Sequence, residues 1–262
     1  MKRLFTLAAA AIALTFAAGA AGAHEEQTVR IGTEGAYPPF NSIDSSGNLV
    51  GFDVDIAKAL CKAAHFKCEF VVQDWDGMIP GLIAKKYDAI IASMSITEER
   101  KQKVDFTNKY YSTPAKFVAK EGANFDISAE GLAGKAIGVQ GATIHENFVR
   151  DNFPDTTVRS YKTQDEANQD LVSGRVDLVL ADSVALLDGF LNTDAGKGFA
   201  FFGPGYTDPK WFGDGVGIAI RKGQDDLRMK LNAAIDQIRA DGTYKTIQDK
   251  YFDFDVYGAP TS

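Results

Sequence analysis

Charged, polar and aromatic residues follow the predicted strands of this 262-residue chain at the points where those strands end. They are Glu34 and Tyr37 in TEGAYPPF, Trp75 in QDWDG, Ser93, Ser95, Thr97 and Arg100 in ASMSITEER, Gln140, Gly141 and Thr143 in GVQGAT, and Asp182 in VLAD. Open α/β sheets bind ligands beyond the carboxyl ends of their strands. An arginine, two carboxylates and two aromatic rings at such positions therefore predict a binding site.

Catalytic signatures are missing from the sequence. It contains no G-x-S-x-G nucleophile turn, no phosphate-binding G-x-x-x-x-G-K-[ST] loop and no G-x-G-x-x-G dinucleotide turn. His145-Glu146 begins like a zinc motif, but Val149 stands where the second histidine would be needed. The three histidines have no ligand-like spacing, so we predict no catalytic residue, no metal and no cofactor.

Apolar strand-like runs alternate with helical patterns, which predicts βαβ units and mostly parallel sheets. One series runs from TVRIGT to YDAIIAS, and a second starts afresh at KAIGVQ and ends with SVALLDGFLN. The two series are joined by two extended segments without helical period, VDFTNKYYSTPAKFVAK and FAFFGPGYTDPKWFGDGVGIAIRK. Two helical stretches close the chain. We predict two α/β lobes, residues 24–111 with 205–262 and residues 112–204, with a hinge at the crossings and a cleft between. The alternative is one continuous sheet.

The N-terminus is typical of a secretory signal peptide. Lys2 and Arg3 precede a short apolar run, and small residues lead to an A-x-A-like end at Ala23. A membrane anchor is the alternative, but the apolar run is short for a span of about 20 residues. Cleavage after Ala23 would leave 26 basic residues against 35 acidic ones, a net charge of −9. We therefore expect an exported, periplasmic protein that avoids nucleic acid and anionic lipid.

Cys61 and Cys68 are the two cysteines, and both lie in the exported part. An even count behind a secretory signal favours a disulfide. Its short loop would join a helix to the next strand rather than hold the fold together. Two buried free thiols are the alternative.

The sequence resembles the periplasmic polar amino-acid-binding proteins of ABC importers, solute-binding protein family 3. It is most similar to those for lysine, arginine, ornithine and histidine. The matching stretches include IGTEGAYPPF, GFDVDIAKALC, DWDGMIPGL, YDAIIASMSIT, GKAIGVQGAT, SGRVDLVLAD and FGDGVGIAIRKG, in family order over nearly all of the exported chain. The resemblance implies a two-lobed type II periplasmic-binding-protein fold with a two-strand hinge. It also implies delivery of the ligand to a membrane permease by a monomeric protein.

The resemblance implies a role for each site residue. Arg100 would bind the ligand's α-carboxylate through two parallel hydrogen bonds, assisted by Ser95 and by the backbone N–H of Thr143 at a helix start. Without the resemblance, Arg100 could form a surface ion pair with Glu98 or Glu99, and Thr143 could be a simple helix cap.

The remaining roles concern the ammonium group and the side chain. Asp182 would bind the α-ammonium with Ser93 and Ser95, although it is also a plausible helix N-cap. Tyr37 and Trp75 would sandwich the side chain, and Glu34 would select a positive charge at its tip. The alternatives are core aromatics and a solvated loop acid. The full predicted ligand-binding set is Glu34, Tyr37, Trp75, Ala92, Ser93, Ser95, Arg100, Gln140, Thr143 and Asp182.

Three positions depart from the lysine/arginine/ornithine pattern. Glu34 replaces a shorter Asp, Ala92 replaces a Ser, and Ile144 takes a position that can be polar. Glu34 is typical of the arginine/ornithine-type members, so we expect arginine as ligand, with ornithine, lysine and histidine as further candidates. Alternatives are an octopine-like opine, which Trp75 would suit, a dehydratase-like enzyme on the same fold, and a sensor subunit. Such an enzyme needs a general acid poised over its substrate, whereas the site residues implied here would pair with a zwitterion, so we predict that the protein is not an enzyme.

Overall fold

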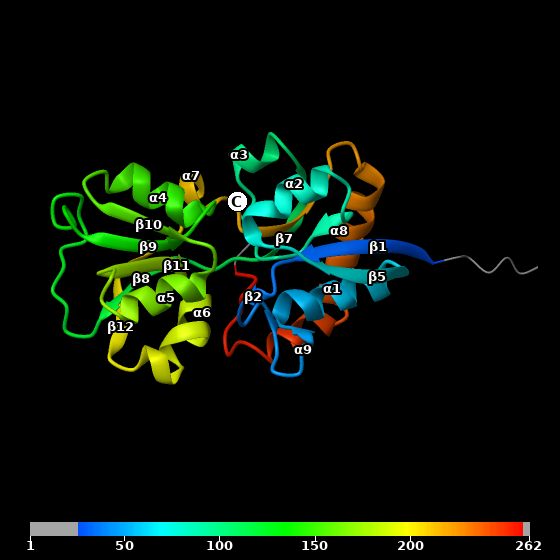
Figure 1. The fold of residues 1–262 in the computed structure, drawn as a ribbon. Helices are drawn as coiled ribbons and strands as arrows, with labels where there is room; N and C mark the ends of the chain where they lie inside the picture. Colours follow the sequence, from blue (N-terminus) through cyan, green and yellow to red (C-terminus); the bar gives the residue numbers. More distant parts are fainter. Residues whose placement is uncertain (1–25, 259–262) are drawn as a thin grey trace, which may run out of the picture.

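The computed structural model describes residues 26–258, so the predicted signal peptide, residues 1–23, lies outside the described residues. Two five-stranded sheets, each with helices on both faces, form two lobes that lie side by side (Figure 1). The alternative of one continuous sheet is therefore wrong. No helix within residues 26–258 is both long and apolar enough to span a membrane.

Lobe 1 is built on a sheet with the strand order β5-β1-β6-β13-β7. Its strands are β1 (Gln27–Thr33), β5 (Phe66–Val72), β6 (Ala89–Ile90), β7 (Asp105–Tyr111) and β13 (Val216–Ile220). One face packs against α1 (Phe52–Ala63), α8 (Asp225–Ala240) and α9 (Thr243–Gln248), and the other against α2 (Met78–Ile83). A short helix, α3 (Glu98–Lys101), precedes β7.

Lobe 2 repeats this arrangement with the strand order β10-β9-β11-β8-β12. Its strands are β8 (Ala115–Lys120), β9 (Ala136–Gln140), β10 (Thr157–Tyr161), β11 (Leu178–Asp182) and β12 (Phe199–Tyr206). Helices α4 (Ile144–Asn152) and α7 (Pro209–Phe212) cover one face, and α5 (Gln164–Val172) and α6 (Ser183–Leu186) cover the other.

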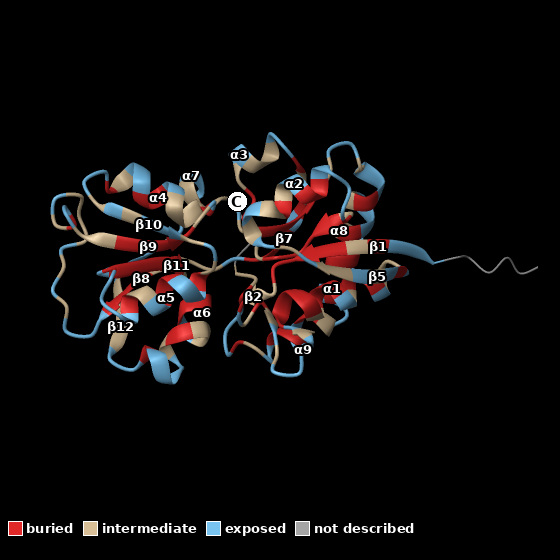
Figure 2. Ribbon diagram, viewed as in Figure 1, coloured by how far each residue is buried: buried red, intermediate tan, exposed pale blue. Residues whose placement is uncertain are grey.

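Apolar side chains at strand and helix periods explain the layers. In α1, Phe52, Ile56 and Leu60 recur every four residues and are fully buried against the sheet. Strand β13 is buried at all five positions because helices cover both faces of its sheet. Burial is concentrated in the central strands of both lobes (Figure 2).

Both sheets are mostly parallel, as the alternation of strands and helices predicted. In lobe 1, β5, β1 and β6 pair in parallel, β13 is antiparallel to its neighbours, and β7 returns to the first direction. Lobe 2 has the same pattern, with β8 as its reversed strand. The carboxyl ends of β1 and β6, and of β9 and β11, therefore share an edge within each lobe.

Two segments carry the chain between the lobes. Residues 112–114 connect β7 to β8, and residues 207–215 connect β12 to β13. Residue 205, where the sequence placed the return to lobe 1, lies within β12, and α7 in the second segment was not predicted. The α7 residue Phe212 packs into the core beneath α4, which explains a helix where the sequence pattern is extended.

Smaller elements complete the structure. A three-stranded sheet, β2 (Ala36–Tyr37), β3 (Asn41–Ile43) and β4 (Leu49–Val50), lies between β1 and α1 and was not predicted. The predicted helix over 183–192 is α6 followed by a π-helix, Leu187–Leu191. The predicted disulfide between Cys61 and Cys68 is confirmed and links α1 to β5.

A charged cavity between two lobes

A cavity lies between the lobes, and all ten predicted ligand-binding residues line it. The other lining residues are Tyr111, Ser112, Thr113, Ala115, Ile144, His145, Thr207, Phe212, Gly213, Gly215 and Val216. Strand ends account for this gathering: Glu34 follows β1, Gln140 ends β9, and Asp182 ends β11. The roles of the ten residues toward a ligand stay predictions.

Arg100 carries a positive charge without an ion-pair partner in the described part of the chain. Its Nη1 donates to the Ser95 carbonyl oxygen (3.1 Å), and its guanidinium carbon lies 5.3 Å from the centre of the Trp75 ring. Across the described chain, no carboxylate lies within ion-pair distance of the guanidinium, so the alternative of a pair with Glu98 or Glu99 is wrong. Burial lowers the pKa of Arg100 to about 10, which leaves it charged at neutral pH.

Asp182 caps α6 and also faces the cavity. Its Oδ1 accepts from the backbone N–H groups of Val184 (2.8 Å) and Ala185 (3.2 Å), and its Oδ2 accepts from the Thr113 hydroxyl. The predicted N-cap role is thus confirmed. Burial raises the pKa of Asp182 to about 6, against the effect of these hydrogen bonds. The carboxylate has no cationic partner among residues 26–258.

Glu34 is only 7% exposed, which rules out the solvated loop acid. Its Oε1 accepts a 2.6 Å hydrogen bond from Nε2 of Gln140, which comes from the other lobe. Burial raises the pKa of Glu34 to about 7; the Gln140 hydrogen bond opposes this rise, and the nearby charge of Asp74 adds to it. In the described structure, Glu34 therefore has a neutral partner and no counter-charge.

The two predicted aromatic residues, Tyr37 and Trp75, both form hydrogen bonds across the interface between the lobes. The Tyr37 ring stacks on Phe40 with centroids 6.1 Å apart, and its hydroxyl accepts from the Asp182 backbone N–H (3.3 Å). Nε1 of Trp75 donates to the Ala142 carbonyl oxygen (3.0 Å). Each ring thus belongs to lobe 1 and hydrogen-bonds to lobe 2.

Small polar residues complete the walls. Ser93 has a left-handed backbone (φ 55) and donates its hydroxyl to Asp53, while Ser95 forms an isolated β-bridge with Val216. Thr143 is the N-cap of α4, as one alternative predicted, and its Oγ1 accepts from the Glu146 N–H (3.2 Å). The start of α4 lines the cavity with Thr143, Ile144 and His145, and the helix dipole favours an anion there.

Sequence reasoning missed several polar residues of the cavity, among them Thr113 and His145. Thr113 lies in the first crossing and donates to Asp182; the predicted hinge itself was the available signal, because a cleft between lobes must border its crossings. His145 follows Thr143 in the first turn of α4. Burial and the charge of Arg100 lower the pKa of His145 to about 3, so the imidazole is neutral. The described part of the chain contains no His, Cys, Asp and Glu group able to hold a metal.

Two lobes of matching strand order, two connecting crossings and a charged cavity between them define a two-lobed α/β binding protein of the type II periplasmic class. The chain belongs to the bacterial extracellular solute-binding proteins, family 3, whose model matches residues 29–254.

Within this family, the chain is similar to several individual proteins. The chain is 53% identical to the L-arginine-binding protein of Pseudomonas aeruginosa, over 99% of this chain and 100% of the relative. It is 43% identical to the histidine-binding periplasmic protein of Escherichia coli K12, over 98% and 100%. A Salmonella typhimurium periplasmic binding protein of high arginine specificity has a similar structure, with a TM-score of 0.80 at 34% identity, over 86% and 99% of the two chains.

Proposed function

We propose that this protein binds a cationic L-amino acid, arginine before ornithine, lysine and histidine, in the cavity between its lobes. It delivers the ligand to the membrane permease of an ABC importer from the periplasm, as a monomer. The similarity to the arginine-binding proteins of P. aeruginosa and S. typhimurium supports arginine.

One observation carries the proposal: the cavity holds three charged residues, and none of them has an opposite charge within the described structure. Arg100 suits an α-carboxylate, Asp182 suits an α-ammonium, and Glu34 suits a positive side-chain tip. Burying a charge without a partner is costly. A ligand that carries the three complementary charges removes that cost, and free arginine, lysine and ornithine are such ligands.

The preference for arginine follows from the surroundings of Glu34. A guanidinium is planar and can stack against aromatic faces while it donates parallel hydrogen bonds to a carboxylate. Tyr37 and Trp75 supply the faces, and Glu34 supplies the carboxylate. Ornithine and lysine offer only a compact ammonium group.

Binding, rather than catalysis, is the proposed activity. The charged cavity residues would form ion pairs with a zwitterion, and His145 is neutral because burial, together with the charge of Arg100, lowers its pKa to about 3. We further propose that the lobes rotate about residues 112–114 and 207–215. The boundary 111/112 inferred from the sequence falls at the start of the first crossing. The boundary 204/205 falls a few residues before the second crossing.

A calorimetric panel tests the proposal. The protein is unfolded, dialysed to strip any ligand, refolded, and titrated with arginine, ornithine, lysine, histidine, citrulline and octopine. We expect arginine to bind tightest and citrulline far more weakly. Tightest binding of octopine would support the opine alternative, and binding of none of the six would refute the proposed function.

A further inference from the structure

A single buried carboxylate lies beneath the lobe 1 wall of the cavity. Asp53, in the first turn of α1, is 0% exposed and does not line the cavity. We infer that Asp53 is a positioning residue that holds the ligand-binding loops of lobe 1 in place and thereby sets ligand affinity. This inference rests on the proposed function.

The first connection leads to Glu34. Nδ2 of Asn41 donates to Oδ2 of Asp53 (2.9 Å), and Oδ1 of the same Asn41 accepts from the backbone N–H of Gly35 (2.8 Å). Gly35 directly follows Glu34 and has φ 75, a conformation that favours glycine. Asp53 therefore fixes the orientation of Asn41, which in turn fixes the turn that carries Glu34.

The second connection leads to the loop after β6. The Ser93 hydroxyl donates to Oδ2 of Asp53 (2.9 Å), and Ser93 has φ 55, which is unfavourable for a residue with a side chain. This hydrogen bond stabilises the strained backbone. Ser95 and Arg100 follow on the same segment, so their positions depend on the path of the chain through Ser93.

The third connection leads to the first crossing. The Tyr110 hydroxyl donates to Oδ1 of Asp53 (2.7 Å), and the Tyr110 carbonyl oxygen accepts from the Tyr244 hydroxyl of α9 (2.7 Å). Tyr110 lies near the end of β7, three residues before Thr113. One carboxylate thus joins three segments that are distant in sequence and that all reach the cavity.

The chemistry of a carboxylate explains why Asp stands here. An ionised carboxylate only accepts hydrogen bonds and has room for several donors, and Asp53 receives three. Burial raises its pKa, and the hydrogen bonds from Tyr110, Asn41 and Ser93 oppose that rise. No cation pairs with Asp53 among the residues described. Its contacts order loops rather than neutralise a charge.

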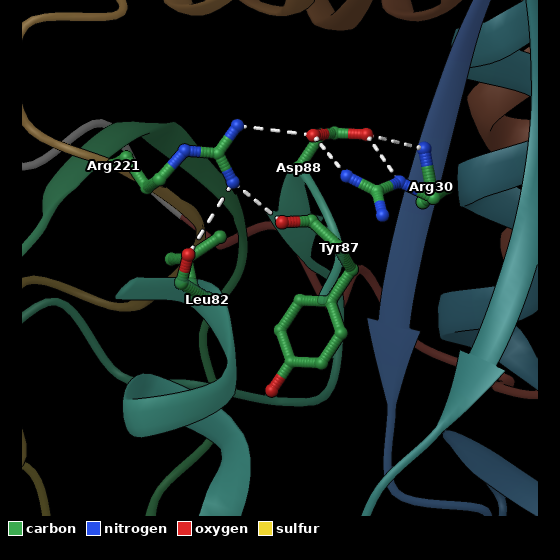
Figure 3. A network of polar contacts seen from close by, with 5 residues as sticks. All are labelled: Arg30, Leu82, Tyr87, Asp88 and Arg221. Atoms are coloured by element: carbon green, nitrogen blue, oxygen red, sulfur yellow. Dashed lines mark hydrogen bonds and ion pairs between the residues drawn. The ribbon is translucent and has the colours of Figure 1, made fainter. Parts of the chain in front are cut away.

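A matched control exists at the other end of the same strands. Asp88 precedes β6 and accepts hydrogen bonds from Arg30 and Arg221, while Arg221 also reaches the Tyr87 carbonyl oxygen (Figure 3). This network lies at the amino end of β6, whereas the cavity lies beyond its carboxyl end. Asp88→Ala therefore removes a hydrogen-bonded carboxylate from lobe 1 without touching the ligand loops.

Calorimetric titration and thermal unfolding of the ligand-free protein test the inference. We expect Asp53→Ala to weaken the binding of both arginine and citrulline by roughly 10- to 100-fold, and arginine at least as much as citrulline, because Glu34 is among the residues that Asp53 positions. We expect Asp88→Ala to lower the melting temperature but to keep affinity within about threefold of wild type. Asp53→Asn should recover most of the affinity, because its carbonyl oxygen can take the Oδ2 position while its amide faces the Tyr110 hydroxyl, which can accept.

A reciprocal exchange keeps the test decisive if Asp53→Ala does not fold. Asn41→Asp alone places two carboxylates together and should weaken arginine binding at least tenfold. Adding Asp53→Asn restores a donor–acceptor pair between positions 41 and 53 and should recover the affinity for arginine. Folded Asp53→Ala with near wild-type affinity, or an exchange that recovers nothing, would overturn the inference. Wild type that binds no amino acid would instead refute the proposed function.

Discussion

Three charged side chains of the cavity differ in what surrounds them, and this difference bears on what each can do for a ligand. Arg100 touches a carbonyl oxygen and an aromatic face, Asp182 a hydroxyl and two helix N–H groups, and Glu34 one amide. Arg100 and Asp182 would meet groups that every amino acid has. Of the three, Glu34 is the residue that would discriminate between side chains by charge.

Arg100→Ala should abolish useful binding of every amino-acid ligand alike. Removing one member of a desolvated charge pair costs roughly 2–5 kcal/mol, or about 30- to several-thousand-fold in affinity. Lys101→Ala is the control, because Lys101 lies next in α3 and pairs with Glu98 at the surface. Calorimetry should show no change for this control. Arg100→Ala with affinity within about threefold of wild type would show that Arg100 does not bind the carboxylate.

Glu34→Gln should weaken arginine more than its neutral analogue citrulline. The substitution keeps the size and hydrogen-bonding capacity of the side chain but removes the charge. We expect a difference between the two ligands of about 1–3 kcal/mol. Titration of wild type and variant with both ligands measures it directly. Equal losses would contradict the assignment of a cationic ligand.

Binding of arginine should depend on pH through Glu34. Its pKa of about 7 means that a proton must leave before a cation can pair with it. Below pH 7, the arginine affinity should fall about tenfold per pH unit relative to citrulline. Asp182, with a pKa of about 6, should affect the binding of both ligands equally, so its effect cancels in the ratio of arginine affinity to citrulline affinity. The ratio should be flat with pH in Glu34→Gln; a flat ratio in wild type would contradict this account.

The same pKa has a consequence for stability. Because the folded-state pKa of Glu34 lies above its ordinary value of 4.5, the folded protein holds this proton more tightly than the unfolded chain. The contribution of Glu34 to the free energy of unfolding is therefore favourable at low pH and lost as pH rises from about 4.5 to 7.

Helix starts fix the segments that carry the site. Thr97, Thr143 and Asp182 cap α3, α4 and α6 with their side chains. A capping box between Thr163 and Glu166 begins α5. These caps satisfy N–H groups at helix ends that would otherwise lack partners. Each short helix can therefore end a loop at a defined position beside the cavity.

The disulfide should matter for stability and not for binding. It joins α1 to β5, the edge strand of its sheet, and neither cysteine lines the cavity. Closing so short a loop stabilises the protein by about 2.5 kcal/mol. Urea unfolding of ligand-free Cys61→Ala/Cys68→Ala should show a loss of this size, with arginine affinity unchanged. A large loss of affinity would show that the bond orders the site.

Contacts between the lobes surround the cavity. Tyr37 bonds to Asp182, Glu34 bonds to Gln140, and Trp75 bonds to Ala142. Lys162 of lobe 2 forms a 2.9 Å ion pair with Asp74 of lobe 1, and its carbonyl oxygen accepts from Nε2 of Gln140 (3.2 Å). The contacts of Glu34, Gln140, Lys162 and Asp74 are thus continuous across the interface.

The Asp74–Lys162 pair should slow ligand release. Both side chains are more than half exposed, so solvent screens the pair and its contribution is small. Stopped-flow measurements on Asp74→Ala, Lys162→Ala and the double variant should show dissociation about 1.5- to 5-fold faster, with the double no worse than either single. High salt should reduce the effect. Additive effects would mean that the two residues do not act as a pair.

The sequence by itself determined the order of the main strands and helices of the two lobes, the two series with two crossings, the disulfide, and the residue types at the strand ends. Those features depend on local periodicity, on the spacing of residues along the chain and on a family pattern that spans it. The sequence also predicted Asp182 as a cap, because capping involves neighbours two and three residues away.

Only the tertiary structure decided what surrounds the charges. Glu34 meets Gln140 across 106 residues of sequence, and Asp53 joins Asn41, Ser93 and Tyr110 from three different segments. The inclusion of Thr113 and His145 in the cavity, and the burial of Phe212 that makes α7, likewise depend on contacts between lobes or layers. Burial and its effect on pKa arise from such distant contacts, which no local pattern in the sequence records.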